Sequence, residues 1–416
     1  MKDATIALHY GYKKDEQKTM QVPIYMTTAY EYNDTDHAAR LFNLEEEGNI
    51  YTRISNPTTR VFEKRIAKLE CGIDALATAS GMSAIFYSIA NLVEAGDNII
   101  ISNKLYGGSI TLSTHTLKEF NIDVKLFDVH NPKELESLID DKTKLILIES
   151  IANPALSVPD FEEIIDIANK KEVIVICDNT IATYCSIKPI KLGCDIVVYS
   201  ASKYIVGNGS AIGGCIIESK NTKNKLKSFR YPKFNKKDES YHGIIYNEKF
   251  DNPFIARARL ALLRDFGAVL SPFNAWLFLL GLEHLHLRIK EHSNNALKIA
   301  NYLYSHKNVK KVYYPFLEND ENYKYAKKYL KYAGGIVSFE LESYEKAKEF
   351  VNKLKIFSLV TNIGDSKSIV THPASTTHQQ LSKKELKEAG INEGLIRLSI
   401  GLEDVDDLIK DLERAL

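Results

Sequence analysis

C-D-I-V-V-Y-S-A-S-K-Y-I-V-G-N-G-S-A-I-G-G, residues 194–214, is the stretch from which the rest of the chain can be interpreted. It begins with a short apolar run, Ile196 to Tyr199, which is typical of a buried strand. The run leads directly into Ser200-Ala201-Ser202-Lys203, and a loop that holds four glycines follows. Because glycine adopts backbone conformations closed to other residues, the stretch predicts a strand that delivers two hydroxyls and one amine into a tight turn.

Lys203 is the chemically distinctive residue of this stretch. An amine in a partly dehydrated pocket has a lowered pKa, and the neutral amine is a nucleophile toward carbonyl groups. A lysine that bonds a carbonyl group, with an anion site beside it, is the pattern expected for pyridoxal phosphate. A lone Ser-x-Ser-Lys is more often a surface lysine after an edge strand, so the rest of the chain must supply the other parts of such a site.

The composition of the chain is that of an ordinary soluble globular protein. Its 416 residues are 44% hydrophobic and 26% charged, which predicts two or three domains. The 54 basic and 54 acidic residues balance, so no overall charge favours nucleic acid or an anionic membrane. The longest apolar stretch, around residues 275–282, is too short to span a bilayer.

The cysteines and the N-terminal residues indicate the compartment. Five cysteines are present, an odd number, and they form no C-x-x-C pair. We expect reduced thiols and neither a disulfide framework nor a zinc site. The first residues, M-K-D-A-T-I-A-L-H-Y, contain no apolar core of the length typical of a signal peptide. These features predict a cytoplasmic protein.

Residues 1–60 lack the apolar periodicity of an independent domain. We expect an arm that lies on the main body or on a neighbouring subunit, since it cannot bury itself alone. Tyr51 and Arg53 are two residues apart, so their side chains would point the same way on an extended segment. An arginine fork beside a phenol suits a phosphate, and an ion pair at an interface is the alternative.

Short apolar strands alternate with helical patterns from residue 58 to residue 203. Strands such as K-L-I-L-I-E (144–149) and V-I-V-I-C (173–177) are apolar on both faces, which predicts a mostly parallel α/β sheet. Ligands of such sheets bind at the carboxyl ends of the strands. The candidate site residues at this edge, or at a helix start, are Ser80, Gly81, Met82, Asn153, Asp178, Ser200, Ser202 and Lys203.

These residues can be assigned to the parts of one site. An aspartate at a strand end stays ionised beside a cation, and a protonated pyridine nitrogen next to Asp178 would be that cation. The helix that follows Ser80 would offer the N–H groups of Gly81 and Met82 to a phosphate, together with the two serine hydroxyls before the lysine. Tyr106, which two glycines follow, would stack its ring on the cofactor.

Seven motifs cover nearly the whole chain: Y-T-R-I-S-N-P, A-S-G-M-S-A, L-Y-G-G, E-S-I-A-N-P, D-N-T, Y-S-A-S-K-Y and R-L-S-I-G. In this order and spacing they resemble the Cys/Met-metabolism family of pyridoxal-phosphate enzymes, which has the aspartate aminotransferase-like fold (fold type I). The resemblance implies a large domain with a mostly parallel sheet and a smaller α+β C-terminal domain. It implies that the cofactor is bound by Tyr51, Arg53, Gly81, Met82, Tyr106, Asn153, Asp178, Ser200, Ser202 and Lys203.

Individual roles also follow from the resemblance. Lys203 would carry the cofactor, Tyr106 would stack on its ring and Asp178 would face its pyridine nitrogen, and these three would be the catalytic residues. Asn153 would lie near the ring oxygen. The arm residues Tyr51 and Arg53 would reach the phosphate in a neighbouring subunit's site.

For the substrate, the resemblance implies that Arg397 binds the α-carboxylate and that Asn362 contributes to binding. The chain departs from the wider family at two positions. Asn362-Ile363-Gly364 stands where many lyases have Ser-Leu-Gly, which is familiar in sulfhydrylase-like members. Ser202 stands where a threonine often precedes the lysine, and it should preserve the hydroxyl.

Three segments most resemble the O-acetylhomoserine sulfhydrylases: D-I-V-V-Y-S-A-S-K-Y-I-V-G-N-G, S-F-R-Y-P-K-F with S-Y-H-G, and T-H-P-A-S-T-T-H-Q-Q-L. This implies a γ-replacement in methionine biosynthesis, in which O-acetyl-L-homoserine and sulfide or a small thiol give L-homocysteine and acetate. Lys203 would move protons at the substrate's Cα and Cβ, and Tyr106 would assist the leaving acetate. Cystathionine γ-synthase and methionine γ-lyase chemistry are alternatives on the same scaffold.

Two readings from other classes are disfavoured. A nicotinamide-dependent reductase would need a different glycine spacing from that of G-N-G-S-A-I-G-G and an acidic residue after a second strand. A catalytically inactive scaffold would not be expected to retain Lys203, Asp178 and Arg397 together.

The chain is expected to have three parts: the arm (1–60), a large cofactor-binding domain (61–257) and a C-terminal α+β domain (258–416). No metal is expected. His284 and His286 would face different ways on a helix, so we interpret them as structural. His372 and His378 lack a carboxylate or cysteine nearby in the sequence, so a loop folded over the active site is the better interpretation.

The arm requires a neighbouring copy of the chain. We therefore expect a homo-oligomer with shared active sites, at least a dimer and more fully a tetramer built as a dimer of dimers. A protein that donates sulfur is a further candidate partner, whereas nucleic acid and membranes are not expected partners.

Overall fold

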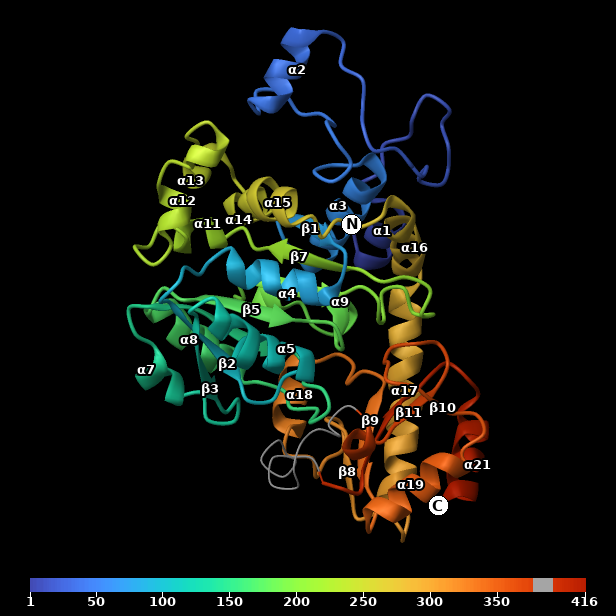
Figure 1. The fold of residues 1–416 in the computed structure, drawn as a ribbon. Coiled ribbons are helices and arrows are strands. Elements are labelled where there is room, and N and C mark those ends of the chain that lie inside the picture. Colours follow the sequence, from blue (N-terminus) through green and yellow to red (C-terminus); the bar gives the residue numbers. More distant parts are fainter. Residues whose placement is uncertain (377–391) are drawn as a thin grey trace.

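The computed structural model describes residues 1–376 and 392–416. Within those residues the larger sheet has seven strands in the spatial order β1-β7-β6-β5-β4-β2-β3 (Figure 1). Neighbours from β6 to β3 run parallel, whereas β7 is antiparallel to both β6 and β1. The strands are β1 (Asp74–Thr78), β2 (Asn98–Ser102), β3 (Asp123–Phe127), β4 (Thr143–Glu149), β5 (Ile174–Asp178), β6 (Ile196–Ser200) and β7 (Gly214–Glu218).

Both faces of this sheet are buried, which explains the nearly continuous apolar runs of its central strands. Every residue of β4 is buried. Its alternate side chains enter different cores, with Leu145 and Leu147 in one and Ile146 and Ile148 in the other. A pattern with polar residues at every second position could not have formed this strand.

Helices cover the two faces of the large sheet. On one face lie α3 (Pro57–Glu70) and α8 (Phe161–Lys170), and on the other lies α4 (Gly81–Ala90). Shorter helices fill the connections: α5 (Gly107–Thr111), α6 (Leu117–Glu119), α7 (Glu134–Leu138), α9 (Thr183–Ser186), α10 (Pro189–Leu192), α11 (Thr222–Lys225), α12 (Pro232–Asn235), α13 (Tyr246–Lys249), α14 (Pro253–Arg257) and α15 (Arg264–Phe266).

A second, smaller sheet lies beyond the carboxyl edge of the first (Figure 1). Its described strands follow the order β10-β11-β12-β9-β8 and are mostly antiparallel. Their bounds are β8 (Lys311–Tyr313), β9 (Ile336–Glu340), β10 (Ser358–Leu359), β11 (Ile369–Thr371) and β12 (Leu395–Ser399). A third hydrophobic core joins it to helices α19 (Tyr344–Lys353) and α21 (Val405–Ala415), and α18 (Tyr323–Tyr329) lies nearby. The mostly parallel large sheet and the smaller second sheet confirm the expected architecture.

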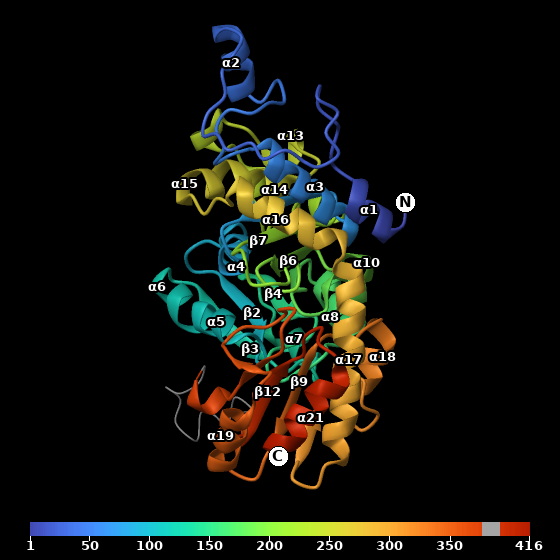
Figure 2. The same cartoon turned by 90° about the vertical axis from the view of Figure 1, so that its right-hand side faces the viewer.

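Two long helices connect these regions. Helix α16 (Pro272–Glu283) packs against α3, and α17 (Leu285–Ser305) runs from the large sheet to the small one (Figure 2). The N-terminal residues contain two helices, α1 (Asp3–His9) and α2 (Thr35–Phe42). Helix α1 packs on α3 and α16, whereas α2 stands away from the rest of the chain. No helix among the described residues has the length and apolar character needed to cross a membrane.

Candidate active site

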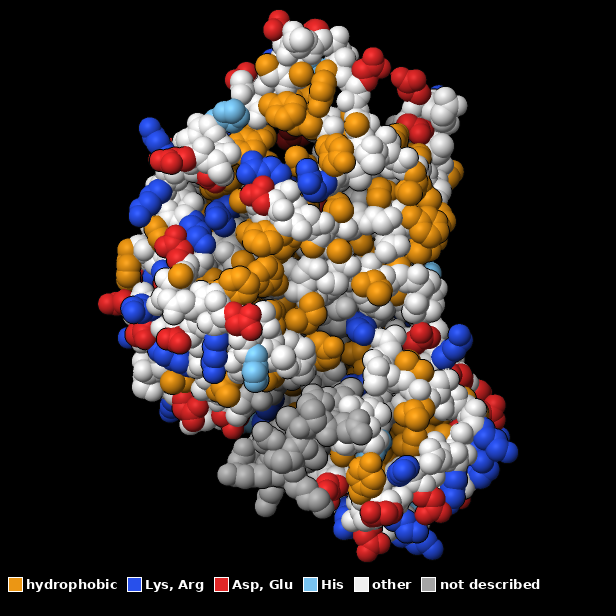
Figure 3. Space-filling view, in the orientation of Figure 1, with side chains coloured by type: hydrophobic (Ala, Val, Ile, Leu, Met, Phe, Trp, Pro, Cys, Tyr) orange, Lys and Arg blue, Asp and Glu red, His pale blue; other side chains and the backbone are white. Residues whose placement is uncertain are grey.

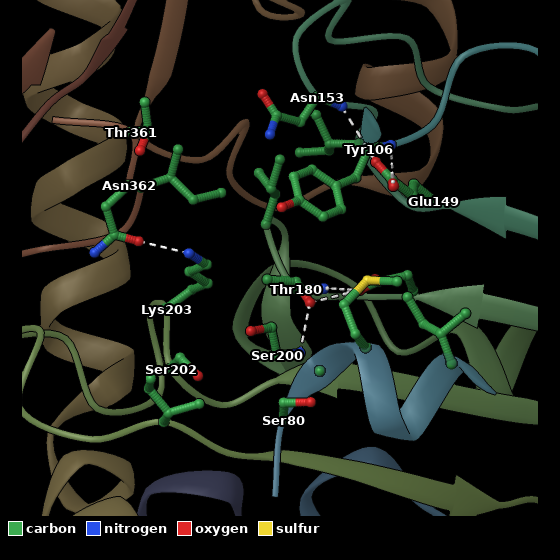
Figure 4. Close-up of a pocket in the computed structure, with 18 of the residues that line it drawn as sticks. Ser80, Tyr106, Glu149, Asn153, Thr180, Ser200, Ser202, Lys203, Thr361 and Asn362 are labelled. Carbon is green, nitrogen blue, oxygen red and sulfur yellow. Dashed lines mark hydrogen bonds between the residues drawn. The ribbon is translucent and has the colours of Figure 1, made fainter. Parts of the chain in front are cut away.

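A cavity of about 610 Å³ lies at the carboxyl edge of the large sheet, where the second sheet approaches it (Figure 4). Its walls come from the ends of β4, β5 and β6, the start of α4 and loops of the C-terminal region. The residues that line it are Ser80, Gly81, Met82, Ile85, Tyr106, Glu149, Ile151, Asn153, Asp178, Thr180, Ile181, Ser200, Ser202, Lys203, Ile212, Thr361, Asn362, Ile363, Thr376 and Arg397. Sequence segments separated by hundreds of residues thus meet in one space.

Lys203 projects into this cavity from the turn that follows β6 (Figure 4). Its Nζ donates a hydrogen bond to Asn362 Oδ1 across 2.5 Å. Burial, together with the positive charge of Arg397, lowers the pKa of the Lys203 amine. The structure therefore provides the partly dehydrated amine on which the interpretation of the 194–214 stretch depended.

Asp178 ends β5 and presents its carboxylate to the cavity. Its Oδ1 accepts hydrogen bonds from the Thr180 backbone N–H at 2.9 Å and from the Thr180 hydroxyl at 2.5 Å. Burial raises the pKa of Asp178, and the Thr180 bonds oppose this change. Thr180 also accepts a bond from the Ser200 N–H, so the ends of β5 and β6 are tied together. A cation beside Asp178 would keep the carboxylate ionised, which fits a protonated pyridine nitrogen.

Glu149 is a second carboxyl group at this edge, and it is paired in register with Asp178. Burial and the charge of Asp178 raise the pKa of Glu149 well above its usual value. The sequence predicted the strand that Glu149 ends, but Glu149 was not named as a site residue. An acidic residue at the end of so apolar a strand was the feature of the sequence that could have identified it.

Tyr106 directs its ring into the cavity from the loop between β2 and α5 (Figure 4). Its backbone N–H donates to Glu149 Oε1 at 2.6 Å. The residue is 49% exposed, so its ring is not packed into the protein core. The position suits a flat ligand lying over the sheet edge.

Arg397 lies on β12, borders the cavity and is largely buried. Its two terminal nitrogens donate to Asn153 Oδ1 at 3.0 Å, to the Asn362 carbonyl at 3.2 Å and to Thr371 Oγ1 at 3.1 Å. Its Nε is buried without a partner among the described residues. Burial lowers the pKa of Arg397 to about 10. A guanidinium with a spare buried donor and no carboxylate beside it fits an incoming carboxylate.

The expected phosphate residues lie at the other end of the cavity. Helix α4 begins at Gly81, directly after Ser80, and Ser80 caps it by accepting from the Ser83 N–H at 3.0 Å. The first N–H groups of a helix have no intrahelical partner, so they are free for an anion. A Cβ at Gly81 would lie 2.6 Å from Ser200 Cβ, so only glycine allows this helix start to approach β6.

The two serine hydroxyls expected at the phosphate, those of Ser200 and Ser202, have different surroundings. Ser202 Oγ donates to the Gly213 carbonyl at 3.1 Å and accepts from the Gly213 N–H at 3.0 Å. It therefore also holds the glycine-rich loop in place. Ser200 lies close to the start of α4, where its hydroxyl would be 2.9 Å from a Cβ at Gly81.

Tyr51 and Arg53 do not line this cavity. They lie in a turn, in which the N–H groups of Ile54 and Ser55 both bond the Tyr51 carbonyl, so the expected extended segment is wrong. The guanidinium of Arg53 nevertheless lies over the Tyr51 ring, 5.4 Å from its centre. Their expected role toward a neighbouring subunit's phosphate stays a prediction.

The histidines form no metal centre in the part of the chain that the structure describes, where no group of three or more His, Cys, Asp or Glu side chains could hold a metal ion. His284 accepts from Arg288 Nε at 3.0 Å. His372 pairs with Ser375 Oγ and with the Glu393 carbonyl. His378 lies outside the described residues, so the expected loop over the site is described only as far as Thr376, which borders the cavity.

The donor set fits pyridoxal phosphate: a lysine amine, a strand-end carboxylate, a ring positioned for stacking and a helix start open to an anion. Residues that the sequence did not single out also border the cavity, notably Glu149, Thr180 and Thr361. Thr180 lay within the quoted D-N-T motif, whereas Thr361 follows no pattern that points to a site.

Comparison with known proteins agrees with this geometry. Residues 4–416 match the family described as Cys/Met metabolism PLP-dependent enzyme. An O-acetyl-L-homoserine sulfhydrylase of Leptospira meyeri is 46% identical, covering 100% of this chain and 96% of the relative. The O-acetyl-L-homoserine sulfhydrylase 1 of Thermus thermophilus is 42% identical and is covered over 100% of both chains.

A solved structure from Campylobacter jejuni subsp. jejuni, provisionally assigned as an O-acetylhomoserine (thiol)-lyase, is 48% identical with a TM-score of 0.98. It covers 100% of this chain, which covers 99% of it, and it contains N'-pyridoxyl-lysine-5'-monophosphate. These matches confirm the resemblance drawn from the motifs, and the chain belongs to the family of Cys/Met metabolism enzymes that depend on pyridoxal phosphate.

Proposed function

We propose that this chain catalyses the γ-replacement in which O-acetyl-L-homoserine and sulfide, or a small thiol, give L-homocysteine and acetate. One observation carries the proposal: the Lys203 amine and the Arg397 guanidinium face one cavity and are linked through Asn362. A substrate carboxylate held at Arg397 would bring the substrate's Cα within reach of that amine. The names of the relatives at 42–46% identity agree with this reaction.

The cofactor and the lysine share the proton chemistry. When bound, pyridoxal phosphate supplies an electron sink that stores the charge left after a proton is removed. Because its pKa is lowered, part of the Lys203 amine is neutral and can act as a base. It would take the proton from Cα, release it, and then take a proton from Cβ of the substrate. Asn362 orients the amine by accepting its hydrogen bond.

The remaining residues bind and orient. Asp178 would hold a positive charge at the pyridine nitrogen of the cofactor, and Tyr106 would stack on its ring and offer a hydroxyl to the departing acetate. Arg397 binds the α-carboxylate, with Asn153 supporting its guanidinium at 3.0 Å. The helix start at Gly81 and Met82, with Ser200 and Ser202, would bind the phosphate. Acetate would leave Cγ with the electron pair of the broken C–O bond, and hydrosulfide would form the new C–S bond there. Return of one proton each to Cβ and Cα would complete homocysteine.

Lys203→Ala tests the central assignment. The variant should lose the visible absorbance band of lysine-bound cofactor and all turnover. Lys233→Ala is the matched control, because Lys233 is also a half-buried lysine, with a pKa lowered to about 8, but it lies outside the cavity. Retention of the band and of turnover in Lys203→Ala would overturn the assignment.

Product analysis tests the reaction itself. The wild-type holoenzyme is supplied with O-acetyl-L-homoserine and sulfide, with O-acetyl-L-homoserine and cysteine, or with methionine alone. Homocysteine in the first mixture is the expected main product. Faster formation of cystathionine in the second, or of methanethiol in the third, would replace the proposal with cystathionine γ-synthase or methionine γ-lyase activity.

We also propose a cytoplasmic homotetramer, a dimer of dimers whose arms (1–60) serve neighbouring sites, with the domain limits 61–257 and 258–416. The five cysteines form no disulfide, which suits a reducing compartment. The position of Tyr51 and Arg53 away from their own chain's cavity supports shared sites.

A sulfur-carrier protein could replace free sulfide as donor, and activity with sulfide alone at physiological concentration would argue against such a carrier.

A further inference from the structure

Glu149 is a buried carboxyl group that the proposed chemistry does not use. Strand β4, which it ends, lies between β5 and β2 in the sheet. Glu149 therefore lies between Asp178, at the end of β5, and the loop after β2 that holds Tyr106. The side chain is only 7% exposed.

Both carboxyl oxygens of Glu149 accept backbone hydrogen bonds, and they do so from two different segments. Oε1 accepts from the Tyr106 N–H at 2.6 Å, and Oε2 accepts from the Asn153 N–H at 3.2 Å. Tyr106 is the residue that directly precedes helix α5, so its backbone sets where that helix begins. One side chain thus joins the loop after β2 to the turn after β4.

The two segments that Glu149 joins carry different parts of the site. Tyr106 directs its ring into the cavity (Figure 4). Asn153 Oδ1 accepts a hydrogen bond from Arg397 at 3.0 Å, so the turn that Glu149 holds also orients the guanidinium. A displacement of about 1 Å in either backbone would misplace the side chain that this segment positions at a bound substrate.

We propose that Glu149 is a positioning residue that sets the Tyr106 ring and the Asn153–Arg397 pair relative to Asp178. The roles of Tyr106 and Arg397 in this statement rest on the proposed function. The geometry that Glu149 maintains does not depend on which amino acid is the substrate.

The competing explanation is that Glu149 only stabilises the fold. Glu218 provides a matched control, because it is also a buried glutamate that accepts two backbone bonds, from Phe254 at 3.3 Å and Ile255 at 2.9 Å. It ends β7, which is antiparallel to β6, so it lies at the opposite edge of the same sheet. A purely structural role predicts that the two residues respond alike to substitution.

The test compares Glu149→Gln and Glu218→Gln as holoenzymes. Glutamine keeps the shape but retains one acceptor oxygen, so one of the two backbone bonds is lost. In Glu149→Gln we expect a visible circular dichroism signal of the bound cofactor at most about half that of the wild type, with kcat/KM lowered about 10- to 100-fold. Glu218→Gln should lower the thermal unfolding temperature and leave both readouts unchanged.

An unchanged dichroism signal and unchanged kcat/KM in Glu149→Gln would overturn the inference. So would equal losses in Glu218→Gln, because position in the sheet would then not matter. If Glu149→Gln does not fold, Glu149→Asp supplies the same comparison, since its shorter side chain retains the charge but cannot reach both N–H groups.

The dichroism is recorded without substrate, so it separates this inference from the proposed reaction. A wild-type enzyme that makes no homocysteine, combined with a lost signal in Glu149→Gln, would refute the reaction and support the positioning role. Homocysteine formation with an unchanged signal and unchanged kcat/KM in the variant would do the reverse.

Discussion

At the scale of one residue, the burial of Arg397 and its hydrogen-bond partners determine which ligand group it can bind. Its guanidinium has three neutral partners and one unpaired Nε, with no carboxylate among its bonded partners. A buried cation without a counterion is costly, and its pKa is lowered to about 10 for that reason. A substrate carboxylate would relieve this cost, which explains why the residue can bind one tightly.

Arg397→Lys should therefore impair substrate binding although the charge is kept, because lysine lacks the planar fork. The loss of one charged hydrogen bond is worth about 1.5–3 kcal/mol, so KM for the amino-acid substrate should rise about 10- to 100-fold. Steady-state kinetics of the variant and the wild type measure this change in KM. Arg230→Lys is the control, since Arg230 is equally buried and bonds backbone carbonyls away from the cavity, and its KM should not change.

Glu70 predicts a pH-dependent stability at a site that catalysis does not use. It is fully buried and bonds Tyr199 and Asn179, and burial raises its pKa to about 7. The folded chain therefore binds this proton more tightly than the unfolded chain does. The resulting stabilisation is present at acidic pH and is lost as the pH rises through 7.

Glu70→Gln keeps a neutral group at that position, so it should lose less stability than the wild type between pH 5 and pH 8. The raised pKa corresponds to a loss of wild-type folding stability on the order of 3 kcal/mol between acidic pH and pH 8. Denaturant unfolding at both pH values measures it. Equal pH dependence in the two proteins would show that Glu70 is ionised in the folded chain at both pH values.

At the scale of an element, the start of α4 combines a structural cap with a binding position. Ser80 accepts from the Ser83 N–H at 3.0 Å and also borders the cavity. Ser343 caps α19 in the same way, by accepting from the Lys346 N–H at 3.3 Å, but it lies outside the cavity. Comparing Ser80 with Ser343 therefore distinguishes the effect of losing a helix cap from an effect on cofactor binding.

Ser80→Ala and Ser343→Ala should each destabilise the protein by about 1 kcal/mol, the usual cost of losing such a cap. Only Ser80→Ala should weaken cofactor binding, because a frayed helix start no longer presents its N–H groups to the phosphate. Thermal unfolding and titration of the apoprotein with pyridoxal phosphate measure the two effects. Equal cofactor affinity in both variants would remove α4 from the phosphate site.

At the scale of the whole molecule, much apolar surface is left uncovered in one chain. Figure 3 shows hydrophobic side chains spread over the upper half of the face that the molecule presents in the orientation of Figure 1. Large apolar side chains that are mostly exposed include Met20 (82%), Met26 (69%), Ile212 (66%) and Phe266 (65%). Exposure on this scale favours a partner surface, and a second copy of the chain is the partner we propose.

Shared sites can be tested by combining two inactive chains. Arg53→Ala and Lys203→Ala, each with little activity alone, should regain about a quarter of the wild-type activity when co-expressed at equal levels, because a mixed pair contains one intact site. Activity of the purified mixture measures it. A mixture no more active than its components would show that Arg53 does not serve a neighbouring site.

Local patterning was sufficient for several features of this protein. The strand that ends at Ser200, the lysine that follows it and the carboxylate of Asp178 could be predicted because each depends on neighbours within a few residues. An apolar run specifies a buried strand, and its last residue lies at the edge where ligands bind. The motifs then identified the family, which the comparison confirmed.

Other features depend on contacts that no local pattern encodes. The bond from Tyr106 to Glu149 joins residues 43 apart, and the bond from Arg397 to Asn153 joins residues 244 apart. The turn at Tyr51 replaced an expected extended segment because backbone bonds within the arm outweighed its polar, aromatic pattern. The proposed positioning role of Glu149 therefore appears only in the tertiary structure, since its two N–H partners become neighbours only when β2 and β4 pair side by side.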